Sequence, residues 1–325
     1  MSTASIRSLA WLVVFTLPFA CTSESGSHPV APKLYAMSFA NSEWSEPVNL
    51  GTVVNSSSNE QNATLARDGL SLYFSSNRPG GSGPLDIWVS QRACTDPEDA
   101  ACAWQAPVNL GSPINTTGAD FAPNLSGDGH LLFFASNRGG GATDIFVSHR
   151  ADPNDDFGWE DPVPLGPGVN TAAGEQAPMY LQNAEGGSAN LYFNRGALAQ
   201  NQADIYVAAV TRDGETLGPA QLVVELSDPS ANDAAVTIRA DGRELMFWSP
   251  RAGGLGGTDL WMSTRQTIHD SWLPPVNAGT ALNSALDDVT PSLSWDGRTL
   301  IFASNRPGGS GGNDLYMSTR TPSGR

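Results

Sequence analysis

The sequence is poor in basic residues. Among its 325 residues, Lys and Arg number 17 and Asp and Glu 33, for a net charge of −16. Phosphate recognition needs clustered Lys and Arg, and the sequence has no such cluster. Nucleic acid and an anionic membrane surface are therefore not expected as partners.

Histidine is also scarce, and its four copies are scattered. None shows the His-x-x-x-His spacing of a zinc site, and none suggests a nucleophilic triad. Gly308–Gly312 matches Gly-x-Ser-x-Gly in letters. It lies in a repeated hairpin loop, however, whereas a nucleophile elbow needs a strand-to-helix turn. No catalytic residue and no metal ligand are predicted from these patterns.

Of three cysteines, the first follows an apparent export signal. Arg7 precedes an apolar run over residues 9–17, which is too short to span a bilayer. Residues 17–21, Leu-Pro-Phe-Ala-Cys, resemble the lipobox of bacterial lipoproteins, with Pro18 where Leu is usual. We expect residues 1–20 to be a signal peptide, Cys21 to be acylated and residues 21–32 to be a tether. Ordinary cleavage after Ala20 is the alternative.

Acylation of Cys21 would leave Cys94 and Cys102 as an even pair, which suits an oxidising compartment. Both lie in one polar insertion without a nearby histidine. A disulfide within that loop is predicted, and a metal site there is disfavoured.

The rest of the chain is built from a repeat. Five copies occur, at residues 68–90, 128–148, 191–207, 241–263 and 296–318. Each combines an Asp-Gly hairpin, a Leu-x-Phe strand, a Gly-rich loop and a third strand that opens with Asp; the third copy lacks Asp-Gly and has a shortened second strand. A fourth piece carries Pro-Val or Pro-Ala. Repetition at this period is typical of a solenoid or a propeller.

The repeat predicts an all-β fold, a β-propeller with four-stranded antiparallel blades over residues 33–325. Five blades are favoured, and six are the alternative. Pro47–Leu50 would close the ring as the outer strand of the last blade. Residues 33–40 have no obvious place in that ring.

The repeated pattern Asp-Gly-x-x-Leu-x-Phe-x-Ser-Asn-Arg-Pro-Gly-Gly, followed by Asp-Leu-Tyr, resembles the WD40-like propeller repeat of TolB-type periplasmic proteins. This resemblance implies a propeller in the cell envelope. Related repeats occur beside peptidoglycan-binding domains and in prolyl-oligopeptidase-like enzymes, so the family does not determine a function.

Three charged positions recur in every copy and should meet at one rim of each blade. They are an acid at the start of the first strand, an Arg at the end of the second and an Asp opening the third. The candidate residues are Glu60, Arg78 and Asp86; Asp120, Arg138 and Asp144; Glu175, Arg195 and Asp204; Asp233, Arg251 and Asp259; and Asp288, Arg306 and Asp314. An Arg between two carboxylates would act as a structural clamp, because Arg donates bidentately. The alternative is a ligand-binding rim, where the unrepeated Asp287 adds charge.

These features favour a non-catalytic binding or scaffolding propeller, because five-fold repetition suits a recognition surface better than one reactive centre. Its partner would be an envelope protein, a peptide or a glycan, and its location the periplasm or cell surface, as an outer-membrane lipoprotein. No cofactor is expected. The alternatives are a glycosidase- or peptidase-like hydrolase with a channel-mouth site, and a propeller stabilised by calcium.

Overall fold

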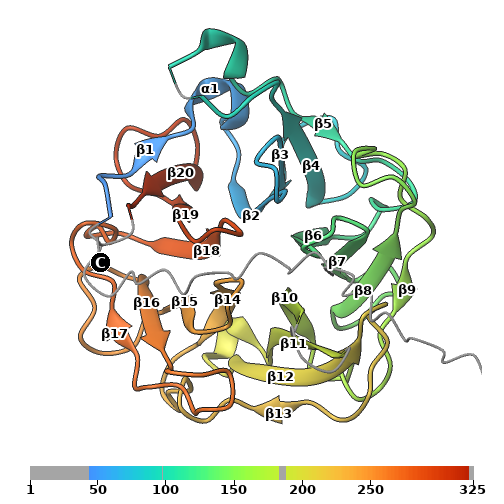
Figure 1. The fold of residues 1–325 in the computed structure, drawn as a ribbon, viewed down its shortest axis with the longest axis vertical. Coiled ribbons are helices and arrows are strands. Elements are labelled where there is room, and N and C mark those ends of the chain that lie inside the picture. Colours follow the sequence, from blue (N-terminus) through green and yellow to red (C-terminus); the bar gives the residue numbers. More distant parts are fainter. Residues whose placement is uncertain (1–43, 97, 183–187, 322–325) are drawn as a thin grey trace, which may run out of the picture. The chain divides into compact units, whose positions relative to one another are not determined.

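The computed structural model describes residues 44–96, 98–182 and 188–321. These residues belong to one compact unit, in which five antiparallel four-stranded sheets are arranged around a central axis (Figure 1). The predicted five-bladed, all-β propeller is therefore confirmed. The predicted signal peptide, Cys21 and residues 33–40 lie outside the described residues, and so the export and lipidation hypotheses stay predictions.

Each blade runs from an inner strand at the axis to a short outer strand. Blade 1 contains β2 (Glu60–Leu65), β3 (Ser71–Ser76), β4 (Asp86–Gln91) and β5 (Val108–Asn109). Blade 2 contains β6 (Asp120–Leu125), β7 (Leu131–Ser136), β8 (Asp144–His149) and β9 (Val163–Pro164). Blade 3 contains β10 (Glu175–Gln182), β11 (Ser188–Arg195), β12 (Asp204–Thr211) and β13 (Gln221–Leu222).

Blade 4 contains β14 (Ala234–Ile238), β15 (Glu244–Ser249), β16 (Asp259–Thr264) and β17 (Val276–Asn277). Blade 5 contains β18 (Asp288–Leu293), β19 (Thr299–Ser304), β20 (Asp314–Thr319) and β1 (Val48–Asn49). The helices are single turns: α1 (Gly51–Val54), η1 (Ala100–Cys102) and η2 (Leu198–Gln200). In the described part of the chain, no helix is long and apolar enough to cross a bilayer.

The ring closes through the first described strand. Val48 pairs with Met317 and Asn49 with Tyr316, so β1 is the outer strand of blade 5. Figure 1 shows this blue strand beside the red β20. The predicted closure by residues 47–50 is thus present.

The second strands form the core between neighbouring blades, because their side chains are apolar on both faces. Tyr73, Phe74, Phe133 and Phe134 are all fully buried. The third copy differs from its prediction. Its second strand, β11, has eight residues, against six in the other blades, and pairs with β12 along its whole length. Its lost Asp-Gly hairpin therefore does not shorten the strand.

The inner strands leave only a narrow channel at the axis. Each has a bulge with one residue at positive φ: Asn62, Ala122, Ala177, Ala235 and Thr290. The hollow that these bulges surround has a volume of about 30 Å³, which is close to the space that one water molecule occupies.

Candidate functional site

Every blade contains an ion pair between an Arg at or just beyond the end of its second strand and an acid at or just before the start of its first strand. The distances are 3.0 Å for Arg78–Glu60, 2.8 Å for Arg138–Asp120, 2.8 Å for Arg195–Glu175 and 2.5 Å for Arg306–Asp288, and Arg251 pairs with Asp233 in the same way. All five carboxylates are completely buried. They therefore serve the blades and are closed to a substrate.

Blade 5 shows how the Arg fixes its surroundings. The Arg306 guanidinium donates to the Leu282 carbonyl at 2.6 Å and to the Ser304 hydroxyl at 3.0 Å. It also lies 5.1 Å from the centre of the Phe302 ring. One side chain thus holds two strands and the preceding loop together, as the clamp interpretation expects.

The predicted third member of each triad does not join the pair. Asp314 instead accepts hydrogen bonds from the backbone N–H groups of Ser310 and Gly311, at 2.6 and 3.1 Å. Asp86 and Asp259 cap the Gly-rich loops of their own blades in the same manner. Loop amides only three or four residues away compete successfully for this carboxylate. The expectation of an Arg between two carboxylates is therefore wrong.

Blades 2 and 3 lack this loop cap. The Gly-rich loop of blade 2 is two residues shorter than that of blade 1, and Asp144 lies half-buried beside an open hollow that Asn170 and Thr171 also line. In blade 3, burial raises the pKa of Asp204, although a hydrogen bond from Ser227 opposes the shift. Asp144 is the one acid among the described residues that line the blade 2 hollow.

Asp287, the residue that breaks the repeat, has a structural contact. Its carboxylate accepts a hydrogen bond from the Asn305 side chain at 3.0 Å, and its backbone N–H donates to the same side chain at 2.8 Å. Asn59 makes the corresponding backbone contact with Asn77. The backbone N–H of Asp287 therefore makes a contact that recurs in another blade, a hydrogen bond to the Asn side chain that follows the second strand.

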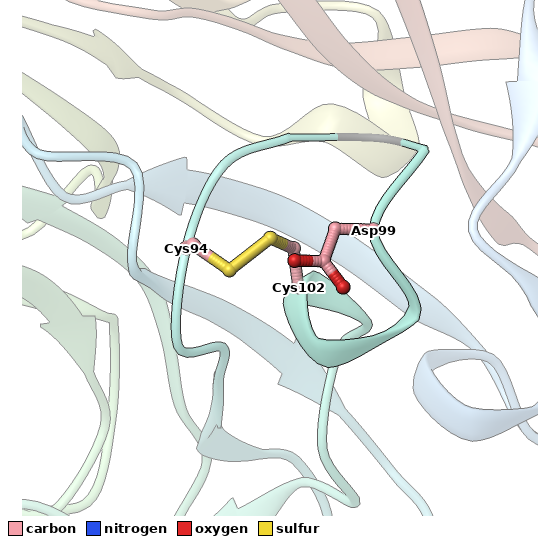
Figure 2. Close-up of side chains that lie close together, drawn as sticks. All are labelled: Cys94, Asp99 and Cys102. Carbon is pink, nitrogen blue, oxygen red and sulfur yellow. A yellow bond between two sulfur atoms is a disulfide. The ribbon is translucent and has the colours of Figure 1, made fainter.

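Figure 2 shows the predicted disulfide between Cys94 and Cys102, with Asp99 beside it. Asp99 accepts a hydrogen bond from the Ala101 N–H and so caps η1. These three side chains are the one close group of potential metal ligands in the described part of the chain. Because metal binding by cysteine requires a thiolate, the joined sulfurs are not available for it.

A second arginine contact was missed in the sequence. In four blades, an Arg that follows the third strand stacks on the Trp of the outer piece: Arg92 on Trp104, Arg150 on Trp159, Arg265 on Trp272 and Arg320 on Trp44. The sequence could have indicated this contact, because an Arg after the third strand and a Trp before the outer strand recur together in these blades.

The central channel has no acid in its described lining. Its inner hollow is lined mainly by Ala, Pro, Thr, Ser and Asn. The hollow at one end adds Leu and Ile side chains together with Met179, Tyr180, Arg67 and Trp295. Burial, followed by the charge of Asp128, raises the pKa of Tyr180 to about 12. The described lining of the channel therefore contains no carboxylate pair.

Trp295 crosses the channel mouth on the face that carries the Asp-Gly hairpins, here called the hairpin face. It belongs to blade 5, yet a Cβ on Gly127 of blade 2 would lie 2.1 Å from its ring. The Arg67 guanidinium of blade 1 stacks on the indole at 4.7 Å and approaches the Gly127 carbonyl at 3.5 Å. The equivalent hairpin position in blade 4 is Ala240. Neither Trp295 nor Arg67 was identified from the sequence.

A hollow of about 410 Å³ adjoins this mouth between blades 1 and 2. Asp68 and Asp128, at the tips of neighbouring hairpins, both line it and both are exposed. Neither forms an ion pair with any described residue. Partial burial would raise the pKa of Asp128, but hydrogen bonds from the Ser126 hydroxyl and the His130 N–H outweigh it and lower that pKa.

No protein-family model matches the chain, and no curated protein matches its sequence. Solved structures do match. The catalytic domain of a GH62 α-L-arabinofuranosidase from Coprinopsis cinerea is 13% identical, with 86% of this chain and 97% of that one aligned at a TM-score of 0.57. An endo-arabinase from Bacteroides thetaiotaomicron is 15% identical, with 85% and 97% aligned at a TM-score of 0.54.

A TolB-type protein from Agrobacterium tumefaciens aligns over 81% of this chain and 78% of its own, at 16% identity and a TM-score of 0.47. That value is too low to support the resemblance to TolB-type repeats, which stays a prediction beyond the shared propeller. At these identities, the enzyme structures show the fold alone.

The comparisons correct the functional prediction. A non-catalytic binding propeller was favoured because five-fold repetition seemed to disfavour a single reactive centre. Glycoside hydrolases with this architecture remove that reason. The preference for a non-enzymatic role is therefore wrong.

Proposed function

We propose that this chain is a hydrolase that acts on carbohydrate at the hairpin-face mouth of the channel. The observation that carries the proposal is one hollow that both Asp68 and Asp128 line, from neighbouring blades, and in which neither acid forms an ion pair with a described residue. Glycoside hydrolysis typically uses two carboxylates that lie on either side of the glycosidic bond. The likeness to arabinofuranosidases and arabinanases supports the scaffold for such chemistry.

The two acids have different surroundings. Asp128 is held ionised by Ser126 and His130, so it is the base or nucleophile in the proposal. Asp68 accepts one hydrogen bond, from the Leu70 N–H at 2.9 Å, and takes the role of proton donor. Asp68 protonates the glycosidic oxygen as its bond to the sugar carbon breaks, and water supplies the new hydroxyl.

The neighbouring Trp295 and Arg67 suit a sugar. An indole offers a rigid apolar face, and sugar sites combine such faces with a few polar groups that set orientation. Because Arg67 stacks on Trp295 and Gly127 lies against it, the ring is fixed before a ligand arrives.

The test is the release of reducing ends from arabinan, arabinoxylan and β-glucan by the purified full chain. We expect Asp128→Asn and Asp68→Asn each to lower the rate by about 10²- to 10⁴-fold. The matched control is Asp296→Asn. Asp296 accepts the same two hairpin hydrogen bonds as Asp128, from Ser294 and Arg298, but it does not line the hollow. Full activity in both Asn variants, or no hydrolysis of any of these polymers, would contradict the proposal.

A further inference from the structure

The hollow at Asp68 and Asp128 is the middle of a longer groove on the hairpin face. Towards the axis, it shares Arg67, Ser126 and Gly127 with the channel-mouth hollow. Towards the outer edge, it shares Asp68 and Asn154 with a further hollow of about 270 Å³. The three hollows therefore adjoin one another in a row, from the channel mouth, which residues of all five blades line, to the space between blades 1 and 2. Together they are here called the groove.

The outer wall of the groove is the loop at residues 152–158, which belongs to blade 2 but is fixed to blade 1. Its buried Asp156 accepts hydrogen bonds from Ser71 at 2.5 Å, Tyr73 at 2.6 Å and Gln91 at 2.7 Å, all in blade 1. Arg150 of blade 2 pairs with it at 3.1 Å. A wall fixed in this way is already ordered, so a ligand does not have to order it on binding.

The outer hollow has the chemistry of a site for hydroxyl groups. The exposed side chains of Gln105 and Asn154 line it, and amides both donate to and accept from hydroxyls. Arg92, which also lines it, donates its Nε–H to the Gly69 carbonyl and stacks on Trp104. The lining of the groove carries three acids, Asp68, Asp128 and Asp156, and three arginines, Arg67, Arg92 and Arg150. Its local charges balance, which suits a neutral ligand, and the net charge of −16 on the whole chain disfavours a polyanion.

We infer that the substrate of the proposed hydrolase is an extended neutral glycan, which lies along the groove and is cut within its chain. That the glycan is cleaved rests on the proposed function. That the ligand is long and neutral rests on the groove alone. Asp68 lies where the middle and outer hollows meet, so sugar units occupy both sides of the bond. The middle and outer hollows each approach or fall within the size of small-molecule sites, about 300–1,000 Å³.

The experiment measures affinity separately from turnover. Linear arabino-oligosaccharides, from disaccharide to hexasaccharide, are titrated calorimetrically into the full chain carrying Asp128→Asn. We expect the hexasaccharide to bind at least about tenfold more tightly than the disaccharide. Adding Gln105→Trp, which fills the outer hollow, should remove that gain. Adding Glu160→Trp should preserve it, because Glu160 is the corresponding exposed residue of blade 2 and lies outside the groove lining.

The outcomes separate the two proposals. Affinity that does not depend on chain length, a hexasaccharide gain that survives Gln105→Trp, or equal binding of oligogalacturonate would overturn the extended neutral glycan. If wild-type protein nevertheless cleaved the disaccharide, the proposed hydrolase would stand without the groove. Length-dependent, Gln105-sensitive binding with no cleavage by wild-type protein would support the groove and contradict the hydrolase.

Discussion

The Asn49 side chain donates a hydrogen bond to Asp314 at 2.9 Å, across 265 positions of the sequence. The carbonyl oxygen of the same amide accepts from Gly51 and from the Asn55 side chain. Asn55 in turn exchanges two hydrogen bonds with the backbone of Leu315. The junction that closes the ring is therefore a polar network attached to a strand of only two residues.

We predict that Asn49→Ala weakens this junction selectively. Loss of a hydrogen bond to a buried carboxylate should lower the free energy of unfolding by about 2 kcal/mol. Native-state hydrogen exchange should then show faster exchange in β1 and β20 than in other blades. Asn109→Ala is the control, because Asn109 makes the same contact to Asp86 within blade 1. Equal and uniform exchange in both variants would contradict a weak point at the junction.

Arg306→Ala should destabilise the protein by roughly 2–4 kcal/mol, because it leaves the buried Asp288 without its ion-pair partner. Denaturant unfolding measures this change. Arg298→Ala should cost less than about 1 kcal/mol, since the Arg298–Asp296 pair is about half exposed and 3.8 Å long. An unchanged stability of the Arg306 variant would refute the clamp.

Gly127→Ala should displace Trp295 from the channel mouth. The added Cβ would lie 2.1 Å from the ring, and overpacking of this kind costs about 1–3 kcal/mol unless the side chain moves. Acrylamide quenching of tryptophan fluorescence should increase, and the increase should disappear in a Trp295→Phe background. Gly139→Ala is the matched control, because no atom lies within 4 Å of its added Cβ.

Asp156 predicts a pH dependence of stability. Burial raises its pKa, but hydrogen bonds from Ser71, Tyr73, Gln91 and Arg150 outweigh burial and lower it. A lowered folded-state pKa stabilises the protein fully above the unfolded value of about 3.9, and this contribution is lost as pH falls through the folded-state pKa. Asp156→Asn breaks a buried ion pair and should cost about 3–5 kcal/mol at neutral pH. The difference in melting temperature between variant and wild type should be largest above about pH 4 and should shrink as the pH falls further, through the folded-state pKa of Asp156. A difference that stays constant as the pH falls would contradict the assignment.

The propeller and its ion pairs were predictable because both repeat. One Arg and one first-strand acid recur in every copy. Antiparallel pairing places Ser304 opposite Asp288, and Arg306, two residues further on, reaches the carboxylate with its long side chain. The role of Asp314 was not predictable in the same way. The strand order correctly predicted the rim on which Asp314 lies. Its carboxylate, however, binds backbone N–H groups of the Gly-rich loop, and these groups are the same in every residue type except proline, so the sequence did not identify them.

The proposed site was missed because it depends on contacts between copies. Trp295 and Gly127 occupy the same position of the repeat in blades that are not neighbours in the ring, and their contact exists only after the ring closes. Variation at that position, from Arg67 to Gly127 to Trp295, was the available signal. Asp68 and Asp128 belong to the Asp-Gly hairpins, whose turn chemistry concealed any second role.

The Ser45 N–H donates to the Thr319 carbonyl at 2.8 Å, so the first and last segments of the propeller lie side by side. Joining those positions with a short peptide and opening any other exposed turn would give a circularly permuted protein with every blade intact. In such a permutant, a covalent link would reinforce the hydrogen-bond network that now holds β1 to β20. The weakest junction of the ring would then lie in the blade that contains the new chain ends.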